Sequence, residues 1–213
     1  MFTKENIKSG WVEIEGVSST EYMLEIAASL GSIRPHPNGE KLSILTPSYG
    51  EHSIKGTFSN RYGFSSFPLH TDTAFWSEPS RYIVIGMFMK SDSNTYLIQT
   101  SDVFSKLSTK ALNYAKSATY VIDTIEGKKY TSLLFSQFSE NGLRFDPCCM
   151  KPINKAAKYF HNEFCGLLEN IKVNSIEWTG NKAVVIDNWK CLHGRSAIAE
   201  DEHSRELMRI YTG

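Results

Sequence analysis

The stretch FPLHTDTAFW, residues 67–76, places a histidine and an aspartate one residue apart among apolar and aromatic neighbours. In an extended strand, residues i and i+2 project to the same face, so His70 and Asp72 would point together with Thr71 opposite. A neutral imidazole and a carboxylate are two of the three ligands of the facial triad that holds non-haem Fe(II). A hydrogen-bonded turn is also typical of such a pair, so a metal centre requires a third ligand from elsewhere in the chain.

The third ligand would be a histidine, and the candidates differ in their surroundings. Three are expected to be solvated surface residues: His36, His52 and His203. His161 lies four residues before Cys165 on one face of an expected helix, where zinc could bind, although a packed histidine is the simpler interpretation. His193 follows the apolar segment AVVIDNWKCL and sits at a strand end, where metal ligands are commonly presented.

The composition indicates an ordinary globular protein. The 213 residues fit one domain, residues 1–213, with 41% hydrophobic and 22% charged residues. Lys+Arg and Asp+Glu are balanced at 23 each, which disfavours nucleic acid and anionic membranes as partners. No segment approaches the roughly 20 apolar residues of a bilayer span. Four cysteines without a secretion signal indicate reduced thiols and a cytoplasmic location.

Hydrophobic periodicity predicts many short strands flanked by a few helices. Helices are expected over residues 19–31, 101–118 and 152–170. Strands are expected at 82–89 and 95–100, joined by the polar turn 90–94, and at 207–212. Shorter strands are expected within 120–137, about a Glu-Gly turn, and within 175–188, about a Thr-Gly-Asn turn. A further short strand is expected after the Pro-Asn-Gly turn at 37–39. This pattern favours an antiparallel sandwich or barrel with helices at its sides.

Two arginines follow His193 in the segment RELMR, four residues apart. If the segment is extended, Arg205 and Arg209 share one face, where a guanidinium can take a carboxylate in two parallel hydrogen bonds. A cosubstrate with a carboxylate at each end would need this arrangement, with one end on the metal and the other on an arginine. The alternative is a surface strand with two solvated arginines.

Together these residues resemble the Fe(II)/2-oxoglutarate-dependent oxygenases of the taurine dioxygenase family. The matching pieces run in the family's order from about residue 56 to the end: HTD (70–72), Thr95 in NTYLIQTSD, DNWKCLHGR (187–195) and RELMRI (205–210). The DNWxxLHGR motif is especially similar to that of γ-butyrobetaine and trimethyllysine hydroxylases. The resemblance implies a mainly β fold with flanking helices, the cupin-like double-stranded β-helix or jelly roll.

The resemblance also implies roles. His70, Asp72 and His193 would bind Fe(II), and Arg205 would bind the distal carboxylate of 2-oxoglutarate, helped by the Thr95 hydroxyl. The implied reaction uses O2 to convert 2-oxoglutarate to succinate and CO2, coupled to hydroxylation, desaturation or cyclisation of a small polar metabolite such as an amino acid or its derivative. The carboxylate at position 72 disfavours halogenation, because related halogenases carry a small residue there to admit chloride.

Six further residues are candidates for contact with substrate or cosubstrate: Arg209, Trp76, Phe75, Arg144, Ser59 and Asn188. Each has a plain structural alternative. The aromatic pair can pack in the core, Arg144 can pair with a carboxylate, Ser59 can form a turn, and Asn188, like its neighbour Trp189, can support the strand of the third ligand. Cys191 is expected to be a buried thiol.

Other functions compete with this interpretation. The chain is short for the group, so a compact pocket or a lid from a homo-oligomer partner is expected to cover the substrate. An oxygenase acting on a protein or nucleic acid is one alternative, and the balanced charge counts against nucleic acid. A jelly-roll module that binds a metal or small acid without turnover is another, and the presence of all three ligands together with Arg205 argues against it.

Overall fold

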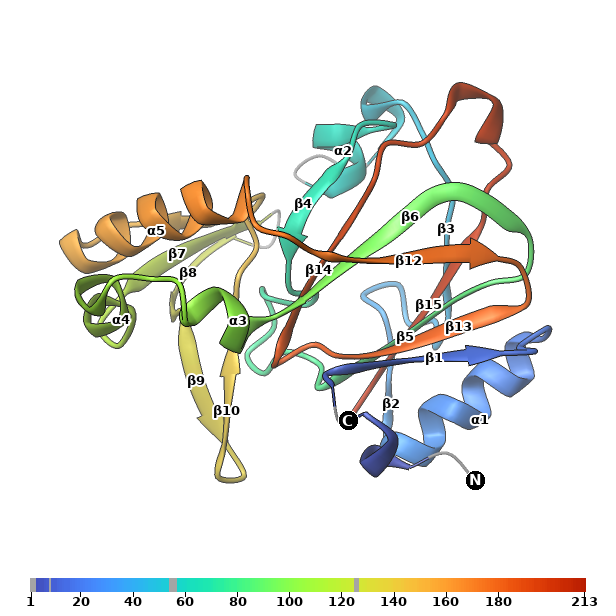
Figure 1. Cartoon of the computed structure of the whole chain (residues 1–213), viewed down its shortest axis with the longest axis horizontal. Helices are drawn as coiled ribbons and strands as arrows, with labels where there is room; N and C mark the ends of the chain where they lie inside the picture. Colours follow the sequence, from blue (N-terminus) through green and yellow to red (C-terminus); the bar gives the residue numbers. More distant parts are fainter. Residues whose placement is uncertain (1–2, 8, 54–56, 125–126) are drawn as a thin grey trace.

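Two antiparallel β-sheets pack face to face in the computed structural model, which describes residues 3–7, 9–53, 57–124 and 127–213 (Figure 1). The larger sheet has the order β1-β13-β5-β15-β2, with β3 also paired to β15: Trp11–Glu15 (β1), Lys182–Asp187 (β13), Tyr82–Met87 (β5), Leu207–Thr212 (β15), Ile33–Arg34 (β2) and Ser43–Leu45 (β3). The smaller sheet has the order β12-β6-β14-β4: Asn174–Thr179, Lys90–Gln99, Cys191–Arg195 and Phe67–His70. The expected jelly roll with flanking helices is confirmed.

The larger sheet is buried on both faces. Its inner face meets the smaller sheet through a cluster that includes Ile83, Leu97 and Trp178. Its outer face is covered by helix α1 (Thr20–Leu30), which confirms the helix expected there. Ser19 begins α1 by accepting a hydrogen bond from the Tyr22 N–H at 3.2 Å. This double burial explains why β5 has an unbroken apolar sequence.

A helical lobe with its own core lies beside the sandwich (Figure 1). Its helices are Thr100–Phe104 (α3), Thr109–Ala115 (α4) and Lys155–Leu168 (α5). Its strands are Thr119–Thr124 (β7), Gly127–Ser132 (β8), Met150–Pro152 (β11) and the hairpin Leu134–Gln137 (β9) with Glu140–Leu143 (β10). The helix expected over 101–118 is thus two short helices, while α5 matches the expected helix. Glu126 of the expected Glu-Gly turn lies outside the described residues.

The remaining short elements complete the chain. Helix α2 (Phe58–Tyr62) precedes β4, and three 3-10 turns occur at Lys4–Asn6 (η1), Gly50–His52 (η2) and Glu200–Glu202 (η3). Within the described ranges, no helix combines the length and apolar character needed to cross a bilayer.

The polar segment 90–94 is part of a strand, so the turn expected there is wrong. Strand β6 starts at Lys90, and its burial alternates: Ser91 and Ser93 are buried while Asp92 is exposed. Small hydroxyl side chains fit the sandwich interior here because they find hydrogen-bond partners, among them the Arg205 side chain. The composition of the segment resembles a turn, but its period of two is that of a strand.

Candidate metal centre

Neighbouring strands bring the two histidines together. His70 ends β4, His193 lies on β14, and the two are direct partners in the antiparallel register with ring centroids 4.3 Å apart. Asp72 Oδ1 lies 3.6 Å from His70 Nε2 and 3.7 Å from His193 Nε2. Two atoms that each lie about 2.1 Å from one ion can be at most about 4.2 Å apart, which both distances satisfy. Among the described residues, this trio is the one group of His, Cys, Asp or Glu side chains arranged for a metal ion.

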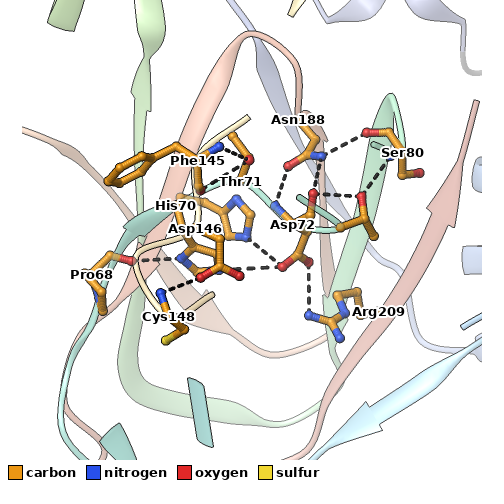
Figure 2. A network of polar contacts seen from close by, with 12 residues as sticks. Pro68, His70, Thr71, Asp72, Ser80, Phe145, Asp146, Cys148, Asn188 and Arg209 are labelled. Carbon is orange, nitrogen blue, oxygen red and sulfur yellow. Dashed lines mark hydrogen bonds and ion pairs between the residues drawn. The ribbon is translucent and has the colours of Figure 1, made fainter. Parts of the chain in front are cut away.

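The first histidine is oriented for ligation. His70 Nδ1 lies 2.8 Å from the Pro68 carbonyl, so Nδ1 carries the proton and Nε2 offers its lone pair toward Asp72 (Figure 2). The Phe58 ring, on α2, stacks on the His70 ring with centroids 4.0 Å apart. The ring therefore has a fixed tautomer and a fixed plane.

Asn188 holds the backbone of Asp72. Its Oδ1 accepts from the Asp72 N–H at 2.8 Å, and its Nδ2 donates to the carbonyls of Asp72 at 3.0 Å and Ser80 at 2.9 Å (Figure 2). The Thr73 hydroxyl donates to the same Asp72 carbonyl at 2.7 Å. Asn188 is fully buried and both atoms of its amide bond to backbone groups, so it positions the aspartate.

The carboxylate of Asp72 is ionised by its surroundings. Burial alone would raise the pKa of Asp72, but the Arg209 guanidinium, followed by the two neighbouring histidine rings, holds this pKa well below its ordinary value. Arg209 Nη1 donates to Asp72 Oδ2 at 3.0 Å, and the Tyr211 hydroxyl donates to the same oxygen at 3.1 Å. Burial lowers the pKa of His193 and favours the neutral ring that a metal ion requires.

A second buried arginine lies on the same inner side of the sandwich. Arg205 precedes β15 and donates from Nε to Ser91 Oγ at 3.1 Å, while its buried Nη2 has no hydrogen-bond partner among the described residues. Ser91, Ser93 and Thr95 occupy alternate positions of β6 and all face the interior. The Thr95 hydroxyl accepts from Trp178 Nε1 at 3.1 Å, which leaves its own proton to donate. Burial lowers the pKa of Arg205 to about 10.

Arg144 binds backbone carbonyls of the loop between Asp72 and β5. Its guanidinium donates to the carbonyls of Ala74, Trp76 and Ser77 at 2.6–2.9 Å, so it clamps the loop that follows Asp72. These bonds include no contact with the metal-ligand trio and no ion pair with a carboxylate, which was the alternative expected for Arg144.

The two aromatic candidates point in different directions. Phe75 packs against the core of the helical lobe. The ring of Trp76 meets that of Tyr211 edge-on at 5.4 Å and carries the Arg34 guanidinium over its face at 4.6 Å. Ser59 is half-buried on α2, one residue after the phenylalanine that stacks on the first histidine.

The surface position expected for His36 is wrong. Its side chain is 6% exposed, and Nε2 lies 3.0 Å from the Arg209 carbonyl. The short strand β2 pairs antiparallel with the end of β15, with Arg34 opposite Tyr211. The residues that follow β2 therefore run alongside β15 toward Arg209, which brings His36 next to it. A two-residue strand gives too little periodicity to be recognised in the sequence.

The other histidines and the cysteine follow expectation. His52 and His203 are exposed. His161 Nε2 lies 3.6 Å from Cys165 Sγ, with no third ligand beside them among the described residues. Cys191 is fully buried, and burial raises the pKa of its thiol to about 12.

Sequence reasoning missed two residues of the site, Tyr211 and Ser91. Tyr211 follows Arg209 by two positions in a strand and therefore shares its face, so the alternation of β15 could have revealed it. Ser91 could have been found through the alternation of β6.

No family model and no curated protein sequence matches the chain. Solved structures match its fold. Asparagine oxygenase, in complex with Fe(II), 2S,3S-3-hydroxyasparagine and succinate, has a TM-score of 0.77 at 15% identity over 96% of this chain and 74% of its own. The non-haem iron oxygenase OrfP, in complex with Fe, succinate and (3S)-hydroxy-L-Arg, has a TM-score of 0.73 at 18% identity over 99% and 76%.

PvcB from Pseudomonas aeruginosa has a TM-score of 0.71 at 17% identity over 97% of this chain and 77% of its own. At such identities the likeness establishes the fold. The chain therefore has the jelly-roll fold of these non-haem iron oxygenases.

Proposed function

We propose that the chain is an Fe(II)- and 2-oxoglutarate-dependent dioxygenase that hydroxylates a small polar metabolite, an amino acid or its derivative. The observation that carries this proposal is the buried group of His70, Asp72 and His193, with one carboxylate oxygen facing both Nε2 atoms. The fold supports it, because the matched asparagine oxygenase and OrfP structures hold iron, succinate and a hydroxylated amino acid.

The three side chains would hold Fe(II), which, with 2-oxoglutarate bound, supplies the activation of O2. The protein supplies position and charge. Arg205 is a buried cation whose charge the Glu202 carboxylate partly offsets, and its Nη2 has no hydrogen-bond partner among the described residues. Its unpartnered Nη2 and the Thr95 hydroxyl would take the distal carboxylate of 2-oxoglutarate, and Ser91 fixes the guanidinium from the other side.

We place the substrate beside Trp76 rather than Phe75. The Trp76 ring lies against Tyr211, whose hydroxyl reaches Asp72, whereas Phe75 packs into the lobe. The Arg34 guanidinium over the Trp76 ring would favour a carboxylate on the substrate. The Phe58 ring, stacked on His70, keeps water from that side of the metal ligands.

The whole chain, residues 1–213, would form one such catalytic domain in a reducing compartment, as in the cytoplasm. All four cysteines are free thiols, which supports this location.

The test is succinate formation by purified protein supplied anaerobically with Fe(II) and then with 2-oxoglutarate, ascorbate and air. We expect succinate, stimulated when the right amino acid is present in a screen of L-amino acids. Asp72→Ala should remove the activity and Lys106→Ala, a change of an exposed residue on the lobe, should keep it. Protein that binds no iron and forms no succinate contradicts the proposal. Binding of both iron and 2-oxoglutarate without turnover would instead favour a non-catalytic module.

A further inference from the structure

The two oxygens of the Asp72 carboxylate have separate tasks. Oδ1 faces His70 Nε2 and His193 Nε2, whereas Oδ2 accepts from Arg209 Nη1 at 3.0 Å and from the Tyr211 hydroxyl at 3.1 Å. A carboxylate oxygen has about two lone-pair sites, so two donors occupy Oδ2 fully. Oδ1 alone then remains for a metal ion.

The register of β15 fixes both donors. Arg209 and Tyr211 are two residues apart in the strand and project toward the same side, into the sandwich. Arg209 pairs with Ile85 and Tyr211 with Ile83 of the central strand β5, so neither can shift without moving the sheet.

The Tyr211 ring is also held from both sides. The Trp76 ring meets it edge-on at 5.4 Å, and the His36 ring lies 4.5 Å from it. The hydroxyl lies 3.1 Å from Asp72 Oδ2, and a carboxylate oxygen accepts hydrogen bonds, so the hydroxyl is the donor. The two ring contacts do not depend on the hydroxyl, so a phenylalanine ring can occupy the same place.

We infer that Tyr211 is a positioning residue that, together with Arg209, locks Asp72 into ligation through one oxygen. The inference rests on the proposed function, since it concerns the same metal centre. Single-oxygen ligation leaves three positions of a six-coordinate ion for cosubstrate and O2, whereas a carboxylate that bound through both oxygens would take one of them. Tyr211 is the clean test of this lock, because its removal leaves the charges of the site unchanged.

The experiment compares Tyr211→Phe with wild type, with Tyr120→Phe as the matched control. Tyr120 is also buried, but it lies in the helical lobe, and its hydroxyl has no hydrogen-bond partner in the part of the chain that the structure describes. Affinity for Co(II) is measured by calorimetric titration of metal-free protein, and the visible absorption of the Co(II) complex reports the coordination geometry. Outer partners of metal ligands typically affect affinity by about 10–100-fold.

We expect Tyr211→Phe to bind Co(II) about 10–100-fold more weakly and with a changed visible spectrum, while Tyr120→Phe matches wild type. Wild-type affinity and spectrum in Tyr211→Phe would overturn the inference, and so would an equal loss in both variants. If Tyr211→Phe does not fold, Arg209→Lys takes its place, because it keeps the charge but loses the fixed guanidinium geometry. Wild-type affinity and spectrum in Arg209→Lys would then overturn the inference.

The two proposals fail separately. Wild-type protein that binds Co(II) but forms no succinate with Fe(II) contradicts the dioxygenase. The role of Tyr211 is then still tested by the Co(II) affinities and spectra of the two variants. Wild-type protein that forms succinate, with a Tyr211→Phe variant of unchanged affinity and spectrum, contradicts the lock alone.

Discussion

At the scale of single residues, a fully buried asparagine determines the position of the Asp72 carboxylate. Asn188 satisfies one N–H and one carbonyl of Asp72 and also a carbonyl of Ser80. These three groups come from a loop with irregular backbone, including Thr73 at a φ of 54°. These backbone groups belong to no helix or sheet that would pair them, so the Asn188 side chain supplies their hydrogen-bond partners.

Asn188→Ala should therefore lower the free energy of unfolding by about 2–5 kcal/mol, because buried polar groups lose their partners. Urea unfolding monitored by tryptophan fluorescence measures the change. Asn188→Asp keeps an acceptor but loses both donations, so it should also destabilise. Asn162→Ala, an exposed position on α5, is the control and should change stability by no more than about 0.5 kcal/mol. Equal stability of the two alanine variants would contradict the role assigned to Asn188.

Arg205→Ala should act on cosubstrate binding. Removing the buried guanidinium should raise the KM for 2-oxoglutarate by roughly 30-fold or more, the equivalent of about 2 kcal/mol for a lost charged partner. The rate at saturating 2-oxoglutarate should fall less than kcat/KM. Initial-rate kinetics of succinate formation separate the two, with Lys106→Ala as the control for loss of a charge. An unchanged KM would show that another group takes the distal carboxylate.

At the scale of elements, one side chain both begins α5 and ties it to the neighbouring sheet. Asn154 Oδ1 accepts from the N–H groups of Ala157 at 2.8 Å and Thr119 at 3.2 Å. Its Nδ2 donates to the Ser117 carbonyl at 2.7 Å. The helix start and the start of β7 therefore share one amide, which couples two elements of the lobe.

Asn154→Ala should cost about 2–3 kcal/mol of stability, which combines a lost helix cap with unpaired groups on the adjacent strand. Asn154→Asp keeps the cap acceptor and loses the donation, so its cost should be smaller. Calorimetric melting of the two variants beside wild type tests this order. The reverse order would contradict the cap role assigned to Asn154.

Elements were predictable from the sequence where local pattern and burial agree. The stripe of α5 and the cap of α1 predicted both helices because one face of each meets a core. Strand β6 was only partly predicted, because its buried positions are serines whose partners come from distant segments: Ser91 bonds to the Arg205 side chain, 114 residues away. Hydrophobicity cannot report a polar side chain that is buried by hydrogen bonding.

At the scale of the whole molecule, the site joins segments that are far apart in sequence. Asp72 and Arg209 are 137 residues apart, and His36 reaches the Arg209 carbonyl across 173 residues. Motif resemblance predicted the trio, which the structure brings together, and it predicted both arginines, because those residues carry recognisable chemistry. It did not identify Tyr211, which only the alternation of β15 would have indicated, or the burial of His36, which follows from strand pairing.

Metal binding should stabilise the entire fold. At about 100 times the dissociation constant, a ligand that binds the folded chain alone adds about 2.7 kcal/mol. In a chain of this size that corresponds to a rise in Tm of roughly 5–10 °C. Calorimetry with Mn(II), which does not oxidise in air, measures the shift. Asp72→Ala should show none, and an equal rise in that variant would mean that the ion binds elsewhere.

The direct pairing of His70 with His193 in the sheet has a further consequence. A backbone ladder, the Asn188 amide and the β15 donors fix the ligands by contacts within the protein. Under the proposed function, loading and removal of iron would be an exchange at a finished site, unlike a zinc finger that unfolds when a chelator removes its metal. Protein stripped by a chelator should keep its near-ultraviolet circular dichroism and regain its activity on simple addition of Fe(II), without any refolding step.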